Sequence, residues 1–165
     1  IPLLTGAKDY KVSDVYVLNI KGIITQEYGK TLLKRIEEIK ANIDDDDVIH
    51  VNISSRGTDD VEMEMPIITF LLNVKQKVIV NVEGVAASAG ADIMMTGDEI
   101  TIDPSSFILF HRAYMLDKNG KKEFMPKSDL REWFFDIFME DHVFKYMTPN
   151  EIKRYKLGQD VWYTG

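Results

Sequence analysis

The sequence predicts a single α/β domain, because short segments rich in β-branched residues alternate with segments of helical periodicity along most of its 165 residues. A chain of this length has room for about one domain. Hydrophobic residues make up 45% and charged residues 28%, which is ordinary for a globular protein. We therefore expect one domain over 1–165, with short right-handed crossovers between its strands.

The first half of the chain is expected to alternate three strands with two helices. In the first helix, the apolar residues Leu32, Ile36 and Ile39 recur at helical spacing. Pro66 must either start or kink the second helix, because proline lacks the N–H that a helix interior requires. The strands are expected over 15–20, 48–53 and 77–82, the helices over 25–41 and within 59–73, and a turn over 54–58.

The second half is expected to contain shorter elements. Asn119 and Gly120 suit the tight primed turn of a β-hairpin. Thr148 and Glu151 have the spacing of a capping box, which predicts a helix start there. The expected elements are a helix opened by the small residues 84–91, strands over 100–102 and 107–110, a hairpin over 114–125, the longest helix over 128–146 capped by Ser128 or Asp129, and a last helix ended by Gly158.

The composition excludes several classes of function. Cysteine is absent, which excludes a disulfide scaffold and a cysteine nucleophile and fits a reducing compartment. A net charge of −7 without a basic stripe is unfavourable for binding nucleic acid. No apolar run approaches the roughly 20 residues that span a bilayer. The acidic run 44–47 is interpreted as a solvated connection rather than a cation site, so we expect no metal and no cofactor.

Ser88 is the first candidate for chemistry, because it follows a predicted strand and precedes a predicted helix. A nucleophilic serine needs a base, and acyl transfer also needs donors for the oxyanion that forms. At a helix start the next N–H, that of Ala89, has no partner within the helix. The competing interpretation makes Ser88 a plain N-cap among small residues that pack a helix closely on a sheet.

A base for Ser88 would have to be one of three histidines. His50 lies within a predicted strand and His142 within a predicted helix, where both have ordinary structural explanations. His111 comes directly after the strand 107–110, and strand ends are where catalytic groups emerge from a parallel sheet. His111 is therefore the preferred candidate, although a structural histidine at a strand end would show the same pattern.

Together these segments resemble the ClpP peptidase family, the proteolytic subunits of ATP-dependent Clp proteases. The resemblance rests on the small residues 86–90 around Ser88, the glycine-containing turn 96–100, the proline-containing segment 103–106 and His111 at a strand end. It spans roughly 14–165. It implies a ClpP/crotonase-like fold with repeated β-β-α units and a protruding handle made by the hairpin and helix over 112–148.

The resemblance also implies the remaining site residues. In the family an aspartate that precedes an aromatic residue and a Ser or Thr completes the triad, and Asp160 matches that pattern. The oxyanion loop corresponds to 54–58, where Gly57 keeps the first family glycine and Thr58 replaces the second. Backbone N–H groups of Gly57, Thr58 and Ala89 would bind the oxyanion. Replacing Thr58 by Gly is then expected to keep or raise activity.

The implied activity is that of a serine endopeptidase that cleaves unfolded polypeptides, with Ser88 as nucleophile, His111 as base and Asp160 as orienting carboxylate. The resemblance further implies a cytoplasmic homo-oligomer, a heptameric ring or two stacked rings, that works with an AAA+ unfoldase. No nucleic-acid or membrane partner is implied. The departures in the oxyanion loop and at the chain end resemble phage-encoded or divergent members.

Three alternatives stay open at this point. One is a catalytically silent ring subunit, which the substitution at Thr58 favours mildly. Another is a capsid-maturation protease of the same fold, and the third is a crotonase-like enzyme acting on acyl-CoA, which would not need a Ser-His-Asp set. The aromatic helix 128–146 is expected to place a Trp133/Phe134/Phe138 surface at a subunit contact, the competing interpretation being a buried helix of a monomer.

Overall fold

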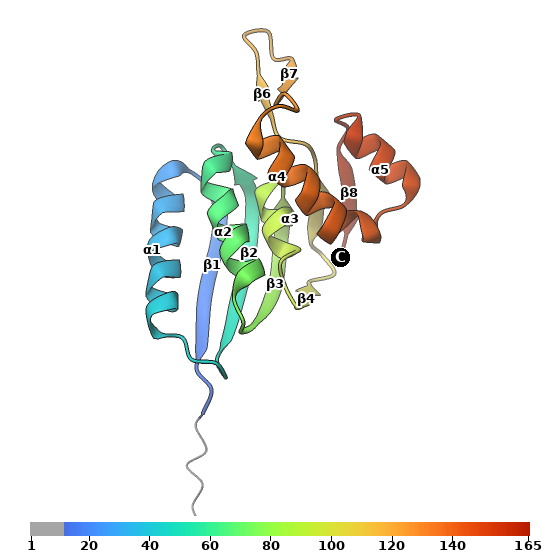
Figure 1. Cartoon of the computed structure of the whole chain (residues 1–165). Helices are drawn as coiled ribbons and strands as arrows, with labels where there is room; N and C mark the ends of the chain where they lie inside the picture. Colours follow the sequence, from blue (N-terminus) through green and yellow to red (C-terminus); the bar gives the residue numbers. More distant parts are fainter. Residues whose placement is uncertain (1–11) are drawn as a thin grey trace, which may run out of the picture.

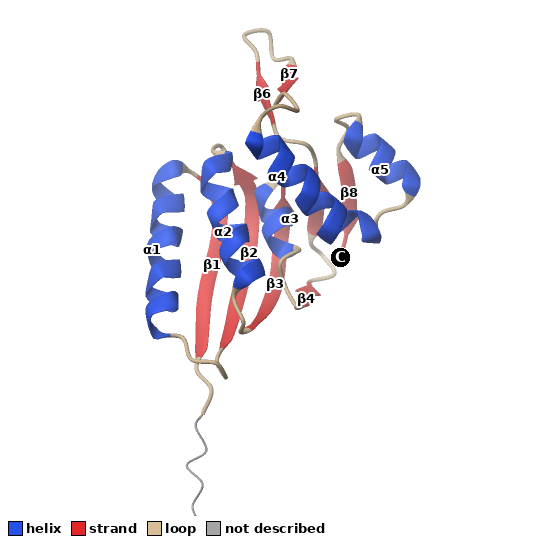
Figure 2. Ribbon diagram, in the orientation of Figure 1, coloured by secondary structure: helices blue, strands red, loops and turns tan. Residues whose placement is uncertain are grey.

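A parallel β-sheet covered on one face by helices forms the body of the molecule (Figures 1 and 2). The structure is a computed structural model that describes residues 12–165, so the first eleven residues of the expected domain lie outside the described residues. The elements are β1 (Val15–Ile24), α1 (Gln26–Asn42), β2 (Val48–Thr58), α2 (Val61–Asn73), β3 (Lys77–Ala87), α3 (Ala89–Met94), β4 (Glu99–Ile102), β5 (Phe107–Phe110), β6 (Tyr114–Leu116), β7 (Lys122–Phe124), α4 (Leu130–Phe138), the π-helix η1 (Met139–Val143), the 3₁₀ helix η2 (Phe144–Tyr146), α5 (Pro149–Lys156) and β8 (Val161–Thr164).

The sheet has the strand order β1-β2-β3-β5-β8, and β4 also pairs with β3. All of its pairs are parallel except that of β5 with β8. Helices α1, α2 and α3 lie in front of β1, β2 and β3 in Figure 1, and their apolar stripes make the core with the inward residues of the strands. The predicted α/β class is confirmed.

The first three strands, β1, β2 and β3, run further than the sequence predicts. The segment 54–58, expected to be a turn, continues β2, because β1 also extends past Gly22 and pairs Ile23 with Gly57 and Ile24 with Thr58. A register shift in β1 at Gly22/Ile23 accommodates this extension. The small residues up to Ala87 likewise continue β3, so that the helix begins only at Ala89.

The predicted long helix is not one continuous α-helix. Nine residues of α4, capped by the Asp129 side chain, pass into η1 and then η2, so α1 with 17 residues is the longest α-helix of residues 12–165. The predicted aromatic surface also needs correction. Phe138 is buried and Phe134 is half-buried, whereas Trp133 is exposed together with Leu130 and Ile137. The spacing of these three residues puts them on one face of α4.

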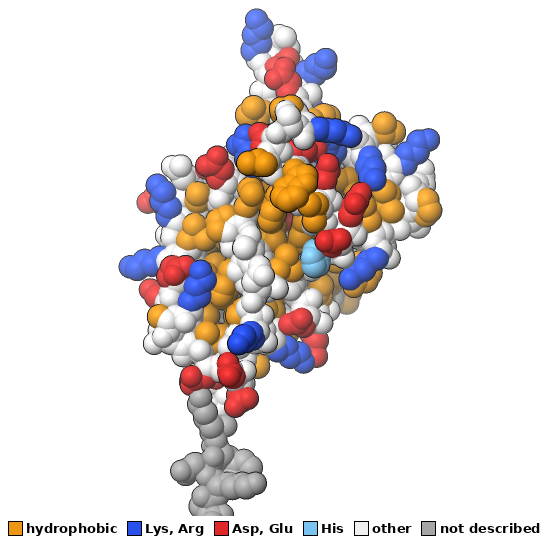
Figure 3. Space-filling view, viewed as in Figure 1, with side chains coloured by type: hydrophobic (Ala, Val, Ile, Leu, Met, Phe, Trp, Pro, Cys, Tyr) orange, Lys and Arg blue, Asp and Glu red, His pale blue; other side chains and the backbone are white. Residues whose placement is uncertain are grey.

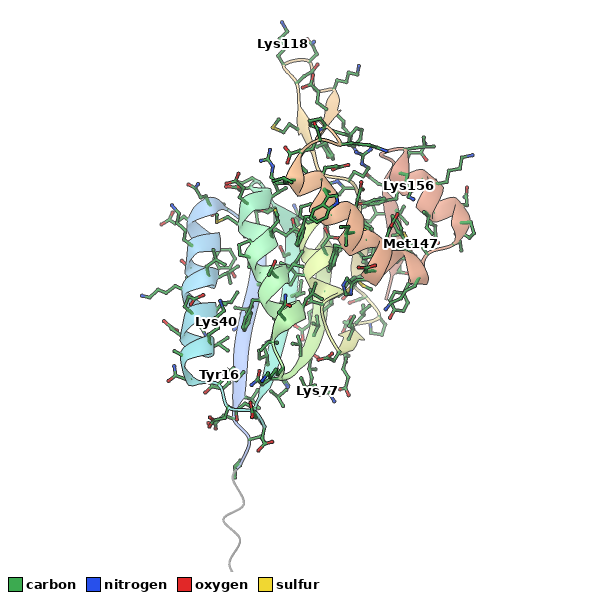
Figure 4. The ribbon with its side chains drawn as sticks, viewed as in Figure 1. Tyr16, Lys40, Lys77, Lys118, Met147 and Lys156 are labelled. Atoms are coloured by element: carbon green, nitrogen blue, oxygen red, sulfur yellow. The ribbon has the colours of Figure 1, made fainter. Side chains whose placement is uncertain are left out.

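The carboxyl ends of β1, β2 and β3 lie at the edge of the sheet from which the β6-β7 hairpin projects (Figure 1). Figure 4 labels Lys77 at the beginning of β3 and Lys118 at the hairpin tip, on opposite sides of this edge of the sheet. The predicted hairpin is present, but its turn is not of the primed type: Gly120 has a φ of 77°, whereas Asn119 has no positive φ, and the Gly120 N–H donates to the Asp117 carbonyl at 2.9 Å. Ligand sites of parallel sheets form at this edge, and the candidate residues are found there.

Candidate active site

Ser88 occupies a strained junction between β3 and α3. Its φ of 54° and ψ of −125° make it the one non-glycine residue with a positive φ among residues 12–165. Such backbone strain costs about 1–3 kcal/mol and concentrates at functional sites. The Ser88 hydroxyl makes no capping hydrogen bond to α3. The interpretation of Ser88 as a plain N-cap is therefore wrong, because a capping serine would use that hydroxyl and an unstrained backbone.

The backbone of Ser88 is fixed from two sides. Its N–H donates to the carbonyl of Leu109 in β5 at 2.9 Å, and its own carbonyl accepts from the N–H groups of Ala91 and Asp92 at 2.8 and 3.0 Å. These bonds join β3, β5 and α3 at one residue. The direction of the Ser88 side chain is therefore set by the sheet and not by a loose loop.

Gly57 lies directly against Ser88. A Cβ added at Gly57 would lie 2.7 Å from the Ser88 Cβ and 3.1 Å from its Oγ, and the φ of Gly57 is 110°. Both the contact and the dihedral angle require glycine here. The Gly57 N–H donates to Ser55 Oγ at 3.2 Å. The predicted oxyanion loop thus reaches the candidate nucleophile.

The Thr58 side chain has a structural role that the sequence did not reveal. Its hydroxyl donates to the Ile24 carbonyl at 2.7 Å and accepts from the Asp60 N–H at 2.9 Å. It therefore joins the end of β1 to the residue that caps α2. The expectation that Thr58→Gly keeps or raises activity stays a prediction, but these hydrogen bonds add an expected cost in stability.

We expect Thr58→Gly to lower the free energy of unfolding by about 1–3 kcal/mol, because it removes two hydrogen bonds and adds backbone freedom to the unfolded chain. Thr58→Ser, which keeps the hydroxyl, is expected to lose much less. Urea denaturation of both variants measures the difference. Equal stability of the two variants would contradict a role for the hydroxyl.

His111 follows β5 and lines the same cleft as Ser88, here called the Ser88 cleft, with a volume of about 350 Å³. Its Nδ1 lies 2.8 Å from the carbonyl oxygen of Arg112. Because a carbonyl only accepts, Nδ1 must carry a proton, so in the neutral imidazole Nε2 is the nitrogen with the lone pair. That tautomer is the one a general base needs.

The backbone of Asp160 lies next to that of His111, but the Asp160 side chain contacts a different residue. In the antiparallel pair of β5 and β8, Phe110 faces Val161, so His111 and Asp160 are the next facing positions. The Asp160 carboxylate instead meets Lys122 of β7, with Oδ1 3.2 Å from Nζ. Asp160 is also not among the residues that line the Ser88 cleft. Ser88 and His111 are thus brought together, and the carboxylate is turned away.

Two further carboxyl groups of the Ser88 cleft were not predicted from the sequence. Glu64 of α2 is buried, and its side chain is hydrogen-bonded to that of Asp92 in α3. Burial, reinforced by Asp92, raises the pKa of Glu64 well above its usual range. Burial also raises the pKa of Asp92 to about 7, and the hydrogen bond from Glu64 opposes that rise. Asp92 is the one charge among the small and apolar residues of α3, a signal that could have identified it, whereas Glu64 shares the first turn of α2 with Glu62.

Two other kinds of site are not found. Residues 12–165 contain no group of three or more His, Cys, Asp or Glu side chains that could hold a metal ion. Within the same residues, no helix has both the length and the apolar character needed to cross a membrane.

A chain that ends one strand on a strained serine and the neighbouring strand on a histidine has the layout of an α/β peptidase. The family model described as Clp protease matches residues 7–128, which is most of the chain. The chain therefore belongs to the Clp protease family, and the family predicted from the sequence is confirmed.

Solved structures show the same fold. A mutant of ClpP1 from Listeria monocytogenes superposes with a TM-score of 0.68 at 20% identity, covering 90% of this chain and 82% of that one. A peptidase from Plasmodium falciparum superposes with a TM-score of 0.65 at 12% identity, covering 91% and 88%. A search of curated proteins found no match.

Proposed function

We propose that the chain is a serine endopeptidase of the Clp type that hydrolyses peptide bonds of unfolded polypeptides. Ser88 Oγ attacks the peptide carbonyl, and His111 Nε2 takes the hydroxyl proton and passes it to the leaving amine. The N–H groups of Ala89 and of Thr58 or Gly57 stabilise the oxyanion. One observation carries this proposal: Ser88, with a strained backbone and a hydroxyl that does not cap α3, lines the same cleft as His111, whose Nδ1 donates to the Arg112 carbonyl.

Asp160 is proposed as the carboxylate that orients His111 in the active state. To do so, the Asp160 carboxylate must leave Lys122 and accept the Nδ1 proton of His111. In the structure, that Nδ1 donates to the Arg112 carbonyl. The facing backbone positions of Asp160 and His111 require no change of strand register for this exchange. Lys122 belongs to the β6-β7 hairpin, so a movement of this hairpin would control the triad.

The decisive experiment is labelling with a fluorophosphonate probe followed by intact mass and peptide mapping. Modification of Ser88 is expected, because only an activated serine reacts. Modification at any other serine, or at none, would contradict the proposal. The absence of any labelling would favour the catalytically silent ring subunit. The observation that supports this alternative is the contact between Asp160 and Lys122.

We also propose that the chain assembles into a homo-oligomeric ring, one or two stacked, that acts with an AAA+ unfoldase in the cytoplasm. Parallel sheets are usually covered on both faces. Within residues 12–165, helices cover one face, whereas Val15, Val17 and Ile23 on β1 are exposed. The exposed face of α4 adds a second apolar surface, which appears as a group of hydrophobic side chains in Figure 3. A contact with a second subunit would cover both surfaces.

Native mass spectrometry is expected to show an oligomer at micromolar concentration, and Trp133→Glu is expected to shift it toward smaller species. Trp133 is 61% exposed and flanked by exposed Leu130 and Ile137, so a charge there disrupts an apolar contact. Leu157→Glu, at a comparably exposed position directly after α5, serves as the control. A monomeric wild-type chain would rule out the assembly.

A further inference from the structure

The carboxyl pair of buried Glu64 and half-buried Asp92 is unusual for a site next to a nucleophile. Glu64 is 3% exposed and shares a hydrogen bond with Asp92, and its Oε1 accepts no N–H or hydroxyl donor from residues 12–165. None of the described side chains that shift the pKa of either group is cationic. A buried carboxyl group without a donor or a cation is costly. Both side chains line the Ser88 cleft, so a molecule bound there would supply what they lack.

Stability does not explain the pair. The pKa of each carboxyl is higher in the folded chain than in the unfolded one. The folded chain therefore binds more protons, and its stability falls as the pH rises between about 4 and 7. Groups that weaken the fold near neutral pH and border a cleft are typical of functional sites.

The Ser88 cleft as a whole is acidic. Arg131 is the one Lys or Arg among the described residues that line it. The Arg131 guanidinium is already paired with Asp129 at 2.6 Å and with Glu62 at 3.6 Å. The carboxyl groups that line the cleft are Asp59, Asp60, Glu64, Asp92, Glu132 and Asp136, of which Glu132 is paired with Arg112. Such a cleft attracts cationic groups and disfavours anionic ones.

The position of the pair fixes which part of a substrate it would meet. Asp92 lies one helical turn beyond Ser88, since its N–H donates to the Ser88 carbonyl. Ser88 attacks the carbonyl of the residue on the acyl side of the scissile bond. The side chain of that residue is attached next to the attacked carbonyl, so it can extend from Ser88 along the cleft that the pair also lines.

We propose that Glu64 and Asp92 bind the cationic side chain of a lysine or arginine residue whose carbonyl Ser88 attacks, so that the enzyme cleaves after basic residues. The inference rests on the proposed peptidase function and deepens it by naming the substrate class. An ammonium or guanidinium group supplies several N–H donors, which satisfies the orphan Oε1 and neutralises the pair. The long aliphatic part of the substrate lysine or arginine side chain spans the Ser88 cleft between Ser88 and the pair.

Binding and cleavage can be tested separately. The Ser88→Ala full-length chain is titrated by calorimetry with two peptides that differ only in arginine or citrulline, the neutral isostere of arginine. We expect the arginine peptide to bind at least about ten-fold more tightly, which is 1.4 kcal/mol or more. In the wild-type chain, coumarin amide substrates with the same two residues should differ similarly in kcat/KM.

Variants locate the preference. Glu64→Gln combined with Asp92→Asn is expected to abolish the difference between arginine and citrulline. Asp59→Asn removes one negative charge at an exposed position of the same cleft and is expected to keep it. If the double variant does not fold, as circular dichroism would show, the comparison of the two peptides on the Ser88→Ala chain still decides the matter.

The outcomes separate the two proposals. Labelling of Ser88 with equal use of arginine and citrulline would overturn the cation site and leave the peptidase function intact. Tighter binding of the arginine peptide without labelling of Ser88 would support a cation-binding cleft and overturn the peptidase function. Equal binding of the arginine and citrulline peptides, together with faster cleavage after leucine, would show that Glu64 and Asp92 only share a proton. That result would also overturn the inference.

Discussion

Ser88→Ala is expected to abolish both fluorophosphonate labelling and peptide cleavage. Loss of a catalytic nucleophile costs on the order of 10⁶ in kcat in well-studied serine peptidases, with a small residual rate from substrate binding and oxyanion stabilisation. The fold should remain, because the Ser88 side chain makes no hydrogen bond to the helix that it precedes. Alanine has nearly the same size and meets the same neighbour, Gly57.

The control for this experiment is Ser128→Ala, a change at an exposed serine just before α4. It should leave labelling and cleavage unchanged. Cleavage of a fluorogenic peptide at the wild-type rate by the Ser88→Ala chain would end the peptidase proposal. Reduced thermal stability of this variant by several degrees would instead indicate that the loss comes from unfolding.

The alternation of strands and helices could be predicted from the sequence because each signal is local. The capping box at Thr148 and Glu151 is present, with both of its hydrogen bonds. The hairpin turn that ends at Gly120 depends on a positive φ that glycine adopts easily, although the turn is not of the primed type that the sequence predicted. The placement of Ser88 and His111 at strand ends followed from the same local reasoning.

The features that could not be predicted depend on partners distant in sequence. The extension of β2 through 54–58 requires β1 beside it, and the hydrogen bond of Thr58 reaches back to Ile24. The break of the long helix into α, π and 3₁₀ segments has no proline or glycine within 130–146 to announce it. The pair of Glu64 and Asp92 joins α2 and α3, and no local pattern indicates that these two helices lie side by side.

Lys122 raises the question of which group orients His111. In the structure, the Arg112 carbonyl accepts the Nδ1 proton and Lys122 holds the Asp160 carboxylate. The Lys122 ammonium also lies 4.3 Å from the centroid of the Tyr114 ring. The centroids of the Tyr114 and His111 rings are 5.2 Å apart. The side chains of His111, Tyr114, Lys122 and Asp160 therefore form one group that connects the end of β5, the hairpin and the start of β8.

Asp160→Asn is expected to lower kcat by on the order of 10⁴, because an amide in place of the carboxylate favours the wrong imidazole tautomer and no longer stabilises the imidazolium. The companion variant Lys122→Gln removes the competing cation, so it should keep or raise the rate. Steady-state cleavage of one fluorogenic peptide by both variants and the wild-type chain measures the effect. Fluorophosphonate labelling rates provide a second reading of the same step.

The two variants together distinguish the possible orienting groups. If the Arg112 carbonyl alone orients His111, both Asp160→Asn and Lys122→Gln will leave the rate near that of the wild-type chain. If Asp160 does so only after leaving Lys122, the first variant will be inactive and the second faster. An inactive Lys122→Gln chain would mean that the ion pair at 3.2 Å holds the β8 segment in place, and the role of Asp160 would then be structural.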